Sequence, residues 1–560
     1  MVNERNRAVR RGAILIAAVA LLAWLLWPLT DRDWQIAGTL EESPEKRRYL
    51  EAERALGRSA NAPRIILIVA DDLARTDVSL YGARHGAAPV PTPAIDSIGL
   101  EGATFTQASA TATICAPSRA ALLTGRYQQR FGFELQPHTR YARNRLEYLG
   151  FRYLVDTDPM SPVAGYGIPP REAMARQGLP ASEINLAELL RARGYRTSIV
   201  GKWHLGYDRA FSPLNRGFEE YYGFYEAFSL FAPIGTPGVV DTPIDDFSDR
   251  HMWRQERTGY SAIVRNDVVV EEEEYLTFRF ADEASEFIRK HADEPFFLYL
   301  PFSAPHTPLQ APERDVEALA HIDDPIRRTY AAMIAALDDA VAQILDAVER
   351  QGIAAETMII FTSDNGGTSY LGVTDNGPLA GGKFTNFEGG TAVPFLIRYP
   401  KAISAGRVVD EPVSLLDVFA TVDAATRAAD VPRPPALAVD GVNLIPRLRR
   451  VSDRAERASP LHEALFFRSF YNKAVRARHW KLIVTEDGAP DVPEGERRIE
   501  LYNLEADPSE QVDVASEHPN VVAELLARLA AWESELPDPK WPPVMHFWHD
   551  IWGKKRWFAI

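Results

Sequence analysis

Residues 65–72 read IILIVADD, an uninterrupted apolar run that ends in two aspartates. A strand whose two faces are both covered needs apolar side chains at every position, which is typical of α/β sheets. Similar short apolar runs alternate with amphipathic helical patterns, such as 325–351, and they lie at 197–200, 296–300, 358–361 and 395–397. This alternation predicts an α/β fold in which helices flank a central sheet.

The pattern changes after about residue 425. A Pro- and Arg-rich stretch is followed by short strand-like pieces around 474–484 and 500–503 and by a helical pattern over 520–535. These features predict a smaller α+β subdomain with an antiparallel sheet. The tail from 541 to 560 contains four tryptophans, which would anchor the chain end on the large domain, line a substrate cleft or touch a membrane.

Composition narrows the class of protein. A chain of 560 residues suits one large domain plus a smaller one. The formal net charge of -15 disfavours a nucleic-acid binder, which usually carries a basic excess. Cys115 is the only cysteine, so an intramolecular disulfide and a thiolate cluster for zinc are excluded.

The N-terminus resembles a membrane-targeting segment. Four arginines precede an apolar run over residues 13–29, which would span about 26 Å as a helix. Asp31 and Asp33 follow the run, so the positive-inside rule leaves the N-terminus in the cytoplasm. We expect residues 1–30 to be an uncleaved signal anchor, with a cleaved signal peptide as the alternative. The chain would then be exported to the periplasmic or extracellular face, with residues 31–62 as a tether.

Acidic and amide side chains follow two of the predicted strands. Asp71 and Asp72 come directly after the first strand, and Asp364 and Asn365 follow the strand at 358–361. Ligands of open α/β sheets bind at the carboxyl ends of the strands. Oxygen ligands from two such ends can share one Ca²⁺ or Mg²⁺ ion. An isolated Asp pair would be a solvated or capping feature, so the prediction depends on the two ends meeting.

Cys115 lies in TICAPSRAALLTGR, where Pro117 suits the first turn of a helix that runs to Arg126. The helix N-terminus favours developing negative charge and would also activate a bare thiolate.

Lys202 and His204 follow the strand at 197–200, and residues two apart in an extended segment point the same way. His306 and Lys383 lie next to the strands at 296–300 and 395–397. Each of these cationic residues is unremarkable alone.

Together these segments resemble the sulfatase family. CAPSR at 115–119 is similar to its Cys-x-Pro-x-Arg signature, and LTGR follows at 123–126. The segments VADDL, TPAID, GKWHLG, APHTP, SDNGG and GGK…FEGG occur in the family's order over about 63–425. LYNLEADPSE, which begins at Leu501, and the helix after it resemble the family's C-terminal subdomain. The resemblance implies an alkaline-phosphatase-like fold with a mixed, mostly parallel sheet, a catalytic domain over 63–425 and a C-terminal subdomain with its tail over 426–560.

The resemblance also implies an activity: hydrolysis of aryl or carbohydrate sulfates, on a sulfated small molecule or glycan. A formylglycine-generating maturation enzyme would oxidise Cys115 to an aldehyde, which hydrates to a gem-diol nucleophile. A divalent ion, usually Ca²⁺ with Mg²⁺ possible, would bind the diol at residue 115 and be held by Asp71, Asp72, Asp364 and Asn365. Arg119 and His204 would steady the diol, while Lys202, His306 and Lys383 would contact the sulfate or its leaving oxygen.

One position departs from the family pattern. The family often has arginine two residues after EGG, and this chain has Ala392 there. Two other hypotheses for the function are open. A metal-dependent hydrolase of phosphorus esters would use the same fold, although phosphatases of that fold typically use Ser or Thr where Cys115 stands. A membrane-anchored binding protein without activity is the second reading, and the complete set of site residues argues against it.

Overall fold

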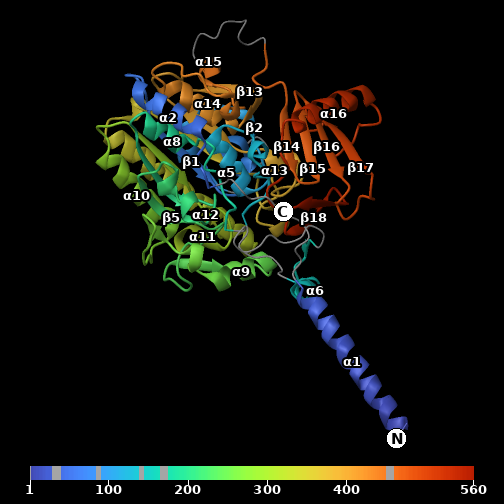
Figure 1. Cartoon of the computed structure of the whole chain (residues 1–560). Coiled ribbons are helices and arrows are strands. Elements are labelled where there is room, and N and C mark those ends of the chain that lie inside the picture. The colour runs from blue at the N-terminus through green and yellow to red at the C-terminus, as the bar shows by residue number, and fades with distance from the viewer. Residues whose placement is uncertain (1, 28–39, 83–89, 138–143, 164–174, 449–458) are drawn as a thin grey trace.

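A ten-stranded mixed sheet forms the centre of the large domain (Figure 1). The computed structural model describes residues 2–27, 40–82, 90–137, 144–163, 175–448 and 459–560. The strands of the sheet, in spatial order, are β13 (Arg407–Ser414), β2 (Ala103–Ser109), β12 (Phe395–Arg398), β11 (Thr357–Ser363), β1 (Arg64–Ala70), β9 (Phe296–Pro301), β4 (Arg196–Lys202), β5 (Glu220–Phe224), β7 (Val264–Arg265) and β8 (Val268–Val269). The run from β11 to β5 is parallel, whereas β12 pairs antiparallel with both its neighbours. The predicted mixed, mostly parallel α/β sheet is confirmed.

Strand β1 shows why its sequence is apolar throughout. Ile65, Leu67 and Val69 belong to the hydrophobic core on one face of the sheet, and the alternate residues Ile66 and Ile68 belong to the core on the other. Residues of a strand alternate between faces, so a strand covered on both sides needs apolar residues at both parities. This pattern places β1 in the interior of the sheet.

Helices cover both faces. Helices α5 (Cys115–Thr124), α8 (Leu186–Ala192) and α14 (Leu416–Thr426) pack on the Leu67 face, and α4 (Pro93–Leu100), α10 (Leu276–Lys290) and α12 (Pro325–Arg350) pack on the Ile66 face. Asn185 begins α8 with a capping box, and Gly125 ends α5 in the left-handed conformation. Further short elements are α3 (Ser79–Gly82), α11 (Glu313–Ala318), α13 (Glu388–Thr391), α15 (Ile445–Leu448), β6 (Val239–Thr242) and β10 (Leu309–Pro312).

The C-terminal subdomain is a four-stranded antiparallel sheet with one helix, as the sequence predicts. Its strands are β14 (Leu465–Ser469), β15 (Asn472–Ala477), β16 (Trp480–Glu486) and β17 (Arg497–Asn503). The strand-like stretch around 474–484 is therefore two strands joined by a hairpin. Helix α16 (Pro519–Glu533) packs on this sheet through Leu525, Leu529 and Trp532. The Arg-rich stretch at 449–458 lies outside the described residues.

The tryptophan-rich tail returns to the large domain. Strands β18 (Met545–Ile551) and β19 (Lys554–Ala559) form a hairpin that pairs with β3 (Met160–Pro162). Trp541 is buried, its indole N–H donates to the Leu135 carbonyl over 2.9 Å, and its ring meets Phe133 edge-on. Of the three roles considered for the tail, anchoring on the large domain is the one that Trp541 performs.

Among the described residues, two helices precede β1. Helix α1 (Val2–Leu26) projects away from the body, and its 18-residue window Val9–Leu26 has a mean hydropathy of 2.0, with none of the window buried (Figure 1). Helix α2 (Pro44–Leu56) lies within the expected tether, but it is docked on α8 rather than extended. Lys46 is buried at this contact, and its Nζ lies 2.7 Å from Glu188 Oε1. The carboxylate offsets the cost of burying the ammonium. Residues 28–39 lie outside the described part of the chain.

We predict that Trp541→Ala destabilises the large domain by about 3–5 kcal/mol, because it removes a buried ring and leaves the Leu135 carbonyl unpaired. Chemical denaturation of the full chain measures the change in unfolding free energy. Trp552→Ala is the matched control, since Trp552 is 50% exposed, and it should change stability by about 0.5 kcal/mol or less. Equal effects of the two substitutions would contradict an anchoring role for Trp541.

Candidate active site

The carboxyl ends of four adjacent parallel strands meet at one edge of the sheet. Ala70 of β1 pairs with Ser363 of β11, so Asp71 and Asp364 are the first residues beyond the same rung of the ladder. Lys202 is the last residue of β4, and the segment that leaves β9 carries His306. All four side chains are buried. The parallel register thus gathers groups that are far apart in the sequence, as expected for residues that follow parallel strands.

Two aspartates after β1 each receive a lysine. Lys202 Nζ lies 2.7 Å from Asp71 Oδ2, and Lys383 Nζ lies 2.7 Å from Asp72 Oδ2. Asp72 has a φ of 62°, a left-handed backbone, and its carboxylate lies on the same side as that of Asp71, because Cys115 Sγ is within 3.8 Å of both. Burial raises the pKa of Asp72, but Lys383, together with His306 and the hydrogen bond from Asn365, holds this pKa below its ordinary value. The Asp72 carboxylate is therefore an ionised ligand.

Asp364 is held by the arginine of the CAPSR segment. Arg119 Nε donates to Asp364 Oδ2 over 2.8 Å, and Arg119 Nη2 lies 3.4 Å from Asp71 Oδ1. The other oxygen of Asp364 accepts the backbone N–H of Asp72 over 3.2 Å. Burial raises the pKa of Asp364 to about 6, against Arg119, which lowers it. The guanidinium therefore bridges the two acidic strand ends.

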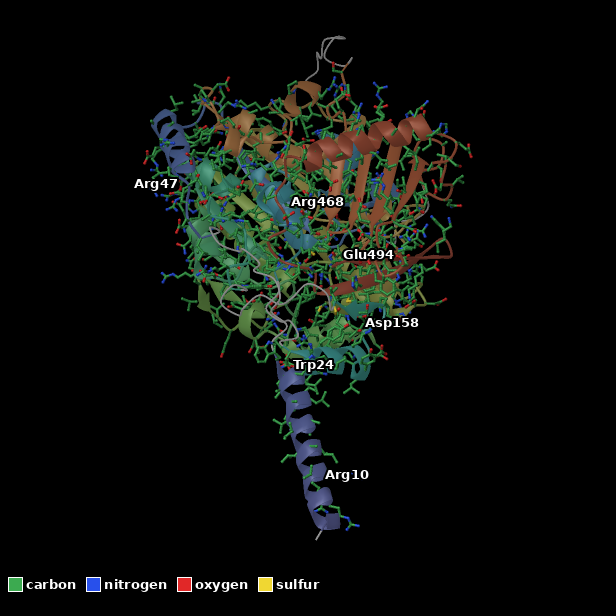
Figure 2. All side chains as sticks on the ribbon, turned by 45° about the vertical axis from the view of Figure 1, so that its right-hand side comes forward. Arg10, Trp24, Arg47, Asp158, Arg468 and Glu494 are labelled. Atoms are coloured by element: carbon green, nitrogen blue, oxygen red, sulfur yellow. The ribbon has the colours of Figure 1, made fainter. Side chains whose placement is uncertain are left out.

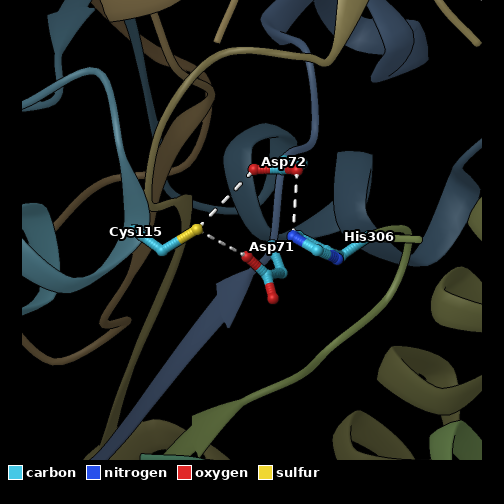
Figure 3. Close-up of side chains that lie close together, drawn as sticks. All are labelled: Asp71, Asp72, Cys115 and His306. Carbon is cyan, nitrogen blue, oxygen red and sulfur yellow. Dashed lines mark hydrogen bonds and ion pairs between the residues drawn. The ribbon is translucent and has the colours of Figure 1, made fainter. Parts of the chain in front are cut away.

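Cys115 is the first residue of α5 and points at the aspartate pair (Figure 3). Its Sγ lies 3.4 Å from Asp71 Oδ1 and 3.8 Å from Asp72 Oδ1. Burial, with the Asp364 carboxylate next, raises the pKa of the Cys115 thiol well above its ordinary value. The helix N-terminus alone would favour a thiolate, but the carboxylates and the lack of solvent oppose it. The unmodified thiol is a poor nucleophile in this position.

His306 and Lys383 lie on the other side of Asp72. His306 Nε2 is 3.5 Å from Asp72 Oδ2 and 3.1 Å from Lys383 Nζ, while its Nδ1 faces the Thr307 carbonyl at 2.5 Å. Burial, with the ammonium of Lys383 next, lowers the pKa of His306 to about 3. Two nitrogen groups that can hold or pass a proton thus stand opposite Cys115.

His204 is buried beside this edge, two residues after Lys202. Strand alternation ends at Lys202, because β4 ends there and His204 has a φ of 56°, outside the extended region. Trp203 between them is buried, as expected, and its indole N–H donates to the Phe211 carbonyl over 2.8 Å. The orientation of His204 is therefore set by the turn and not by strand periodicity.

The side chains fit a divalent cation. Ligand atoms of Asp71, Asp72, Cys115 and His306 all lie within 4.8 Å of one another. Asn365 Nδ2 donates to Asp72 Oδ1 over 2.7 Å, but Asn365 Oδ1 is a buried acceptor without a hydrogen-bond partner among the described residues. A buried oxygen without a donor is costly unless a cation or water takes it. The oxygen-rich set suits a hard ion such as Ca²⁺ or Mg²⁺.

The charges of the site balance before any ligand arrives. Three carboxylates, of Asp71, Asp72 and Asp364, face the three cationic groups of Arg119, Lys202 and Lys383. A divalent cation added to this set makes it a receptor for negative charge. The arrangement therefore suits an anionic substrate that binds together with the ion.

A buried ion cluster, which the sequence patterns did not indicate, ties the C-terminal subdomain to the Lys383 loop. Glu388 of the FEGG segment accepts a hydrogen bond of 2.9 Å from Lys481 Nζ, and this Nζ lies 3.2 Å from Glu510 Oε1. Arg476 Nη1 is 3.3 Å from Glu388. Lys481 and Arg476 lie on β16 and β15, so two strands of the subdomain reach the site loop. Glu388 lies in the FEGG segment, for which the sequence predicted no role. This glutamate was the one sequence signal that could have pointed to the cluster.

The segment after Glu388 is packed so closely that only glycine fits. Gly366 N–H donates to the Gly390 carbonyl over 3.0 Å, and a Cβ on Gly366 would lie 1.8 Å from the Gly389 carbonyl oxygen. Lys383 N–H donates to the Gly367 carbonyl over 2.9 Å in the same packing. Glu388 thereby helps to position the SDNGG loop and Lys383. Ala392 is buried here, and the positive charge beside Glu388 comes from the C-terminal sheet.

Comparisons with known proteins identify the family to which the chain is similar. A model of the sulfatase family matches residues 63–427. Steryl-sulfatase of Mus musculus is 32% identical over 486 residues, 75% of this chain and 70% of that protein. N-acetylgalactosamine-6-sulfatase of Rattus norvegicus is 33% identical over 391 residues, 69% of this chain and 66% of that protein. The solved structure of Ps i-CgsB in complex with k-i-k-neocarrahexaose has a TM-score of 0.68 and 29% identity, over 86% of this chain and 94% of that one.

The Glu388–Lys481–Glu510 cluster gives a pH prediction. Burial raises the pKa of Glu510 to about 7, so between its unfolded value of about 4.5 and pH 7 the folded state holds a proton that the unfolded state releases. The unfolding free energy contributed by Glu510 should therefore fall as the pH rises through this window. Glu510→Gln should flatten the pH dependence of stability there, measured by denaturation at a series of pH values. Glu517→Gln, an exposed control, should leave the wild-type slope; an unchanged slope in Glu510→Gln would contradict the assignment.

Proposed function

The chain belongs to the sulfatase family and is a sulfuric ester hydrolase, and we propose that it releases inorganic sulfate from an aryl or carbohydrate sulfate by means of a nucleophile made from Cys115. The observation that carries the proposal is the position of Cys115 Sγ, 3.4 Å from Asp71 Oδ1 at a helix N-terminus. The raised pKa of this thiol argues against a thiolate mechanism. Oxidation to formylglycine by a maturation enzyme would supply a hydrated aldehyde, whose second hydroxyl lets the enzyme expel sulfate.

The surrounding residues take roles that follow from their contacts. We assign Lys202 and Lys383, whose buried side chains contact Asp71 and Asp72, to the binding of sulfate oxygens. Lys383 Nζ and His306 Nε2, 3.1 Å apart, can deliver a proton to the leaving ester oxygen. Arg119 holds Asp71 and Asp364 in place and steadies the nucleophile. We assign His204 to proton transfer at the nucleophile.

We propose that Asp71, Asp72, Asp364 and Asn365 hold the divalent ion, together with the group at residue 115, and Ca²⁺ is the favoured ion with Mg²⁺ as the alternative. The unpaired Oδ1 of Asn365 supports this set. When bound, such an ion lowers the pKa of a hydroxyl ligand and neutralises sulfate oxygens. His306 also lies within reach of the same ligand atoms, but we assign it to the substrate side.

The names of two relatives support a proposal for the substrate class. Steryl-sulfatase and N-acetylgalactosamine-6-sulfatase are named for a sterol and a sugar sulfate, so we propose a sulfated small molecule or glycan. We further propose that residues 13–29, of which 13–26 lie in α1 and 28–29 lie outside the described residues, act as a signal anchor. It would hold the exported catalytic domain of residues 63–425 and the C-terminal subdomain of 426–560 at the periplasmic or extracellular face. The apolar, unburied window of α1 supports this location.

The reaction is tested with matched aryl esters. The full chain, produced with a maturation enzyme, should release sulfate from 4-nitrophenyl sulfate faster than phosphate from 4-nitrophenyl phosphate. Cys115→Ala should lower sulfate release on the order of 10³-fold or more, as loss of a nucleophile does. Ser118→Ala, in the same turn of α5, is the matched control and should retain activity.

Three outcomes would contradict the proposal. Faster phosphate release would assign the chain to phosphorus esters. Wild-type-like activity in Cys115→Ala would exclude residue 115 as the nucleophile. An intact thiol at Cys115 in active protein, seen by mass spectrometry of its peptide, would exclude formylglycine.

The metal site is tested by binding as well as by turnover. We expect EDTA-treated protein to lose activity and to regain it with Ca²⁺ or Mg²⁺. Asn365→Ala should weaken binding of the ion at least about tenfold in calorimetric titration, with a smaller thermal stabilisation by added metal. Asn365→Asp keeps an oxygen in place and should retain more of the binding; equal affinity in the Ala variant and the wild type would remove Asn365 from the site.

A further inference from the structure

Helix α6 (Arg145–Leu154) presents an apolar face that the described residues of the chain leave uncovered. None of its residues is buried. Leu146 is 47% exposed, Tyr153 75% and Leu154 86%. These positions, with Gly150, are spaced i, i+4, i+7 and i+8, so they share one face of the helix. Neighbouring large apolar side chains with this exposure mark a surface that meets another apolar phase.

The opposite side of α6 is fixed to the body. Phe151 meets Phe247 of α9 (Phe247–Gln255) edge-on at 5.5 Å between ring centres. Just beyond the helix, the Asp156 carbonyl accepts Arg250 Nη2 over 3.2 Å. The helix is therefore held in one orientation, and its apolar face is a permanent feature of the surface.

The position of α6 identifies what covers this face. Arg145 Nη1 donates to the Trp24 carbonyl over 3.4 Å, and its guanidinium lies 4.9 Å from the centre of the Trp24 ring. Trp24 stands near the end of the apolar window Val9–Leu26, where α1 reaches the body (Figures 1 and 2). Tryptophan and arginine at the end of a membrane span are typical of the lipid–water boundary. Contact with Trp24 puts α6 at that level.

We propose that α6 lies in the interface of the bilayer that α1 crosses, with Leu146, Tyr153 and Leu154 among the phospholipid acyl chains. This inference rests on the proposed anchoring by α1. The helix has the composition of an interfacial helix, with an apolar face and arginines at both ends. Its second contact with the bilayer fixes how the body is oriented, whereas α1 alone would leave the body free to tilt.

The experiment uses the full chain in vesicles of phosphatidylcholine with a minor fraction of phosphatidylglycerol. Cys115 is buried and is the only cysteine, so a cysteine introduced on the surface can be labelled selectively with an environment-sensitive fluorophore. We compare Leu154→Cys with Leu56→Cys, a control position 48% exposed at the end of α2, and with Ile16→Cys in α1. The expected result is blue-shifted emission and quenching by spin-labelled lipid at 154 and 16, and quenching by aqueous iodide at 56.

The outcomes separate anchoring from docking. A label at 154 in water, with the label at 16 in lipid, overturns the docking of α6 and leaves the anchor standing. Labels at 154 and 16 both in water overturn both proposals. A label at 154 shielded from iodide but not quenched by spin-labelled lipid overturns lipid contact in favour of a protein partner, such as a second copy of the chain.

Discussion

The structure of the site depends on one constraint, the balance of buried charge at the edge of the parallel sheet. Isolated charges are expensive to bury, so each carboxylate beyond β1 and β11 needs a cation within reach. Lys202, Lys383 and Arg119 supply those cations from three separate elements. The positions of β4, α5 and the Lys383 loop are therefore linked through the carboxylates they share. A divalent cation and an anionic substrate add opposite charges to this set, so they can enter together at little electrostatic cost.

The same constraint extends into the C-terminal subdomain. Glu388 is buried in the loop that packs against the SDNGG segment, and its compensating charges come from β15 and β16. Although burial raises it, Arg476 and Lys481 hold the pKa of Glu388 at about 2. The tail also touches the site loops, since Phe547 of β18 lies against Phe384, next to Lys383. The subdomain is thus part of the support of the active site, and a substitution on its strands can act at Lys383.

The path of the chain connects the site to α6, the helix for which we propose contact with the bilayer. Helix α6 leads to β3, β3 pairs with β18, and β18 carries Phe547 to the site wall. Helix α2, within the stretch expected as a tether, is docked on α8 by the buried pairs Lys46–Glu188 and Glu53–Arg193. The ordered body of the catalytic domain therefore includes α2, which lies within the stretch that the sequence predicts as a tether.

Sequence alone determined the fold class and most of the candidate site, because both depend on local patterns. The apolar run of Ile65 to Ala70 requires cover on two faces, and residues that follow such strands must lie at their carboxyl ends. These two rules are enough to place Asp71, Asp72 and Asp364 at one edge of the sheet, and the helix start at Cys115 follows from Pro117. Ordered motifs supplied the chemistry that single residues could not.

Only the tertiary structure decided what depends on contacts between distant segments. Asp72 and His204 have a left-handed backbone. Strand alternation therefore could not predict the direction of their side chains. The pairing of Glu388 with Lys481 and Arg476 joins segments about 90 residues apart, and no local pattern encodes such a distance. The uncovered face of α6 has the same periodicity as a core helix. Only burial distinguishes an exposed apolar face from a core helix, and burial depends on the fold of the whole chain.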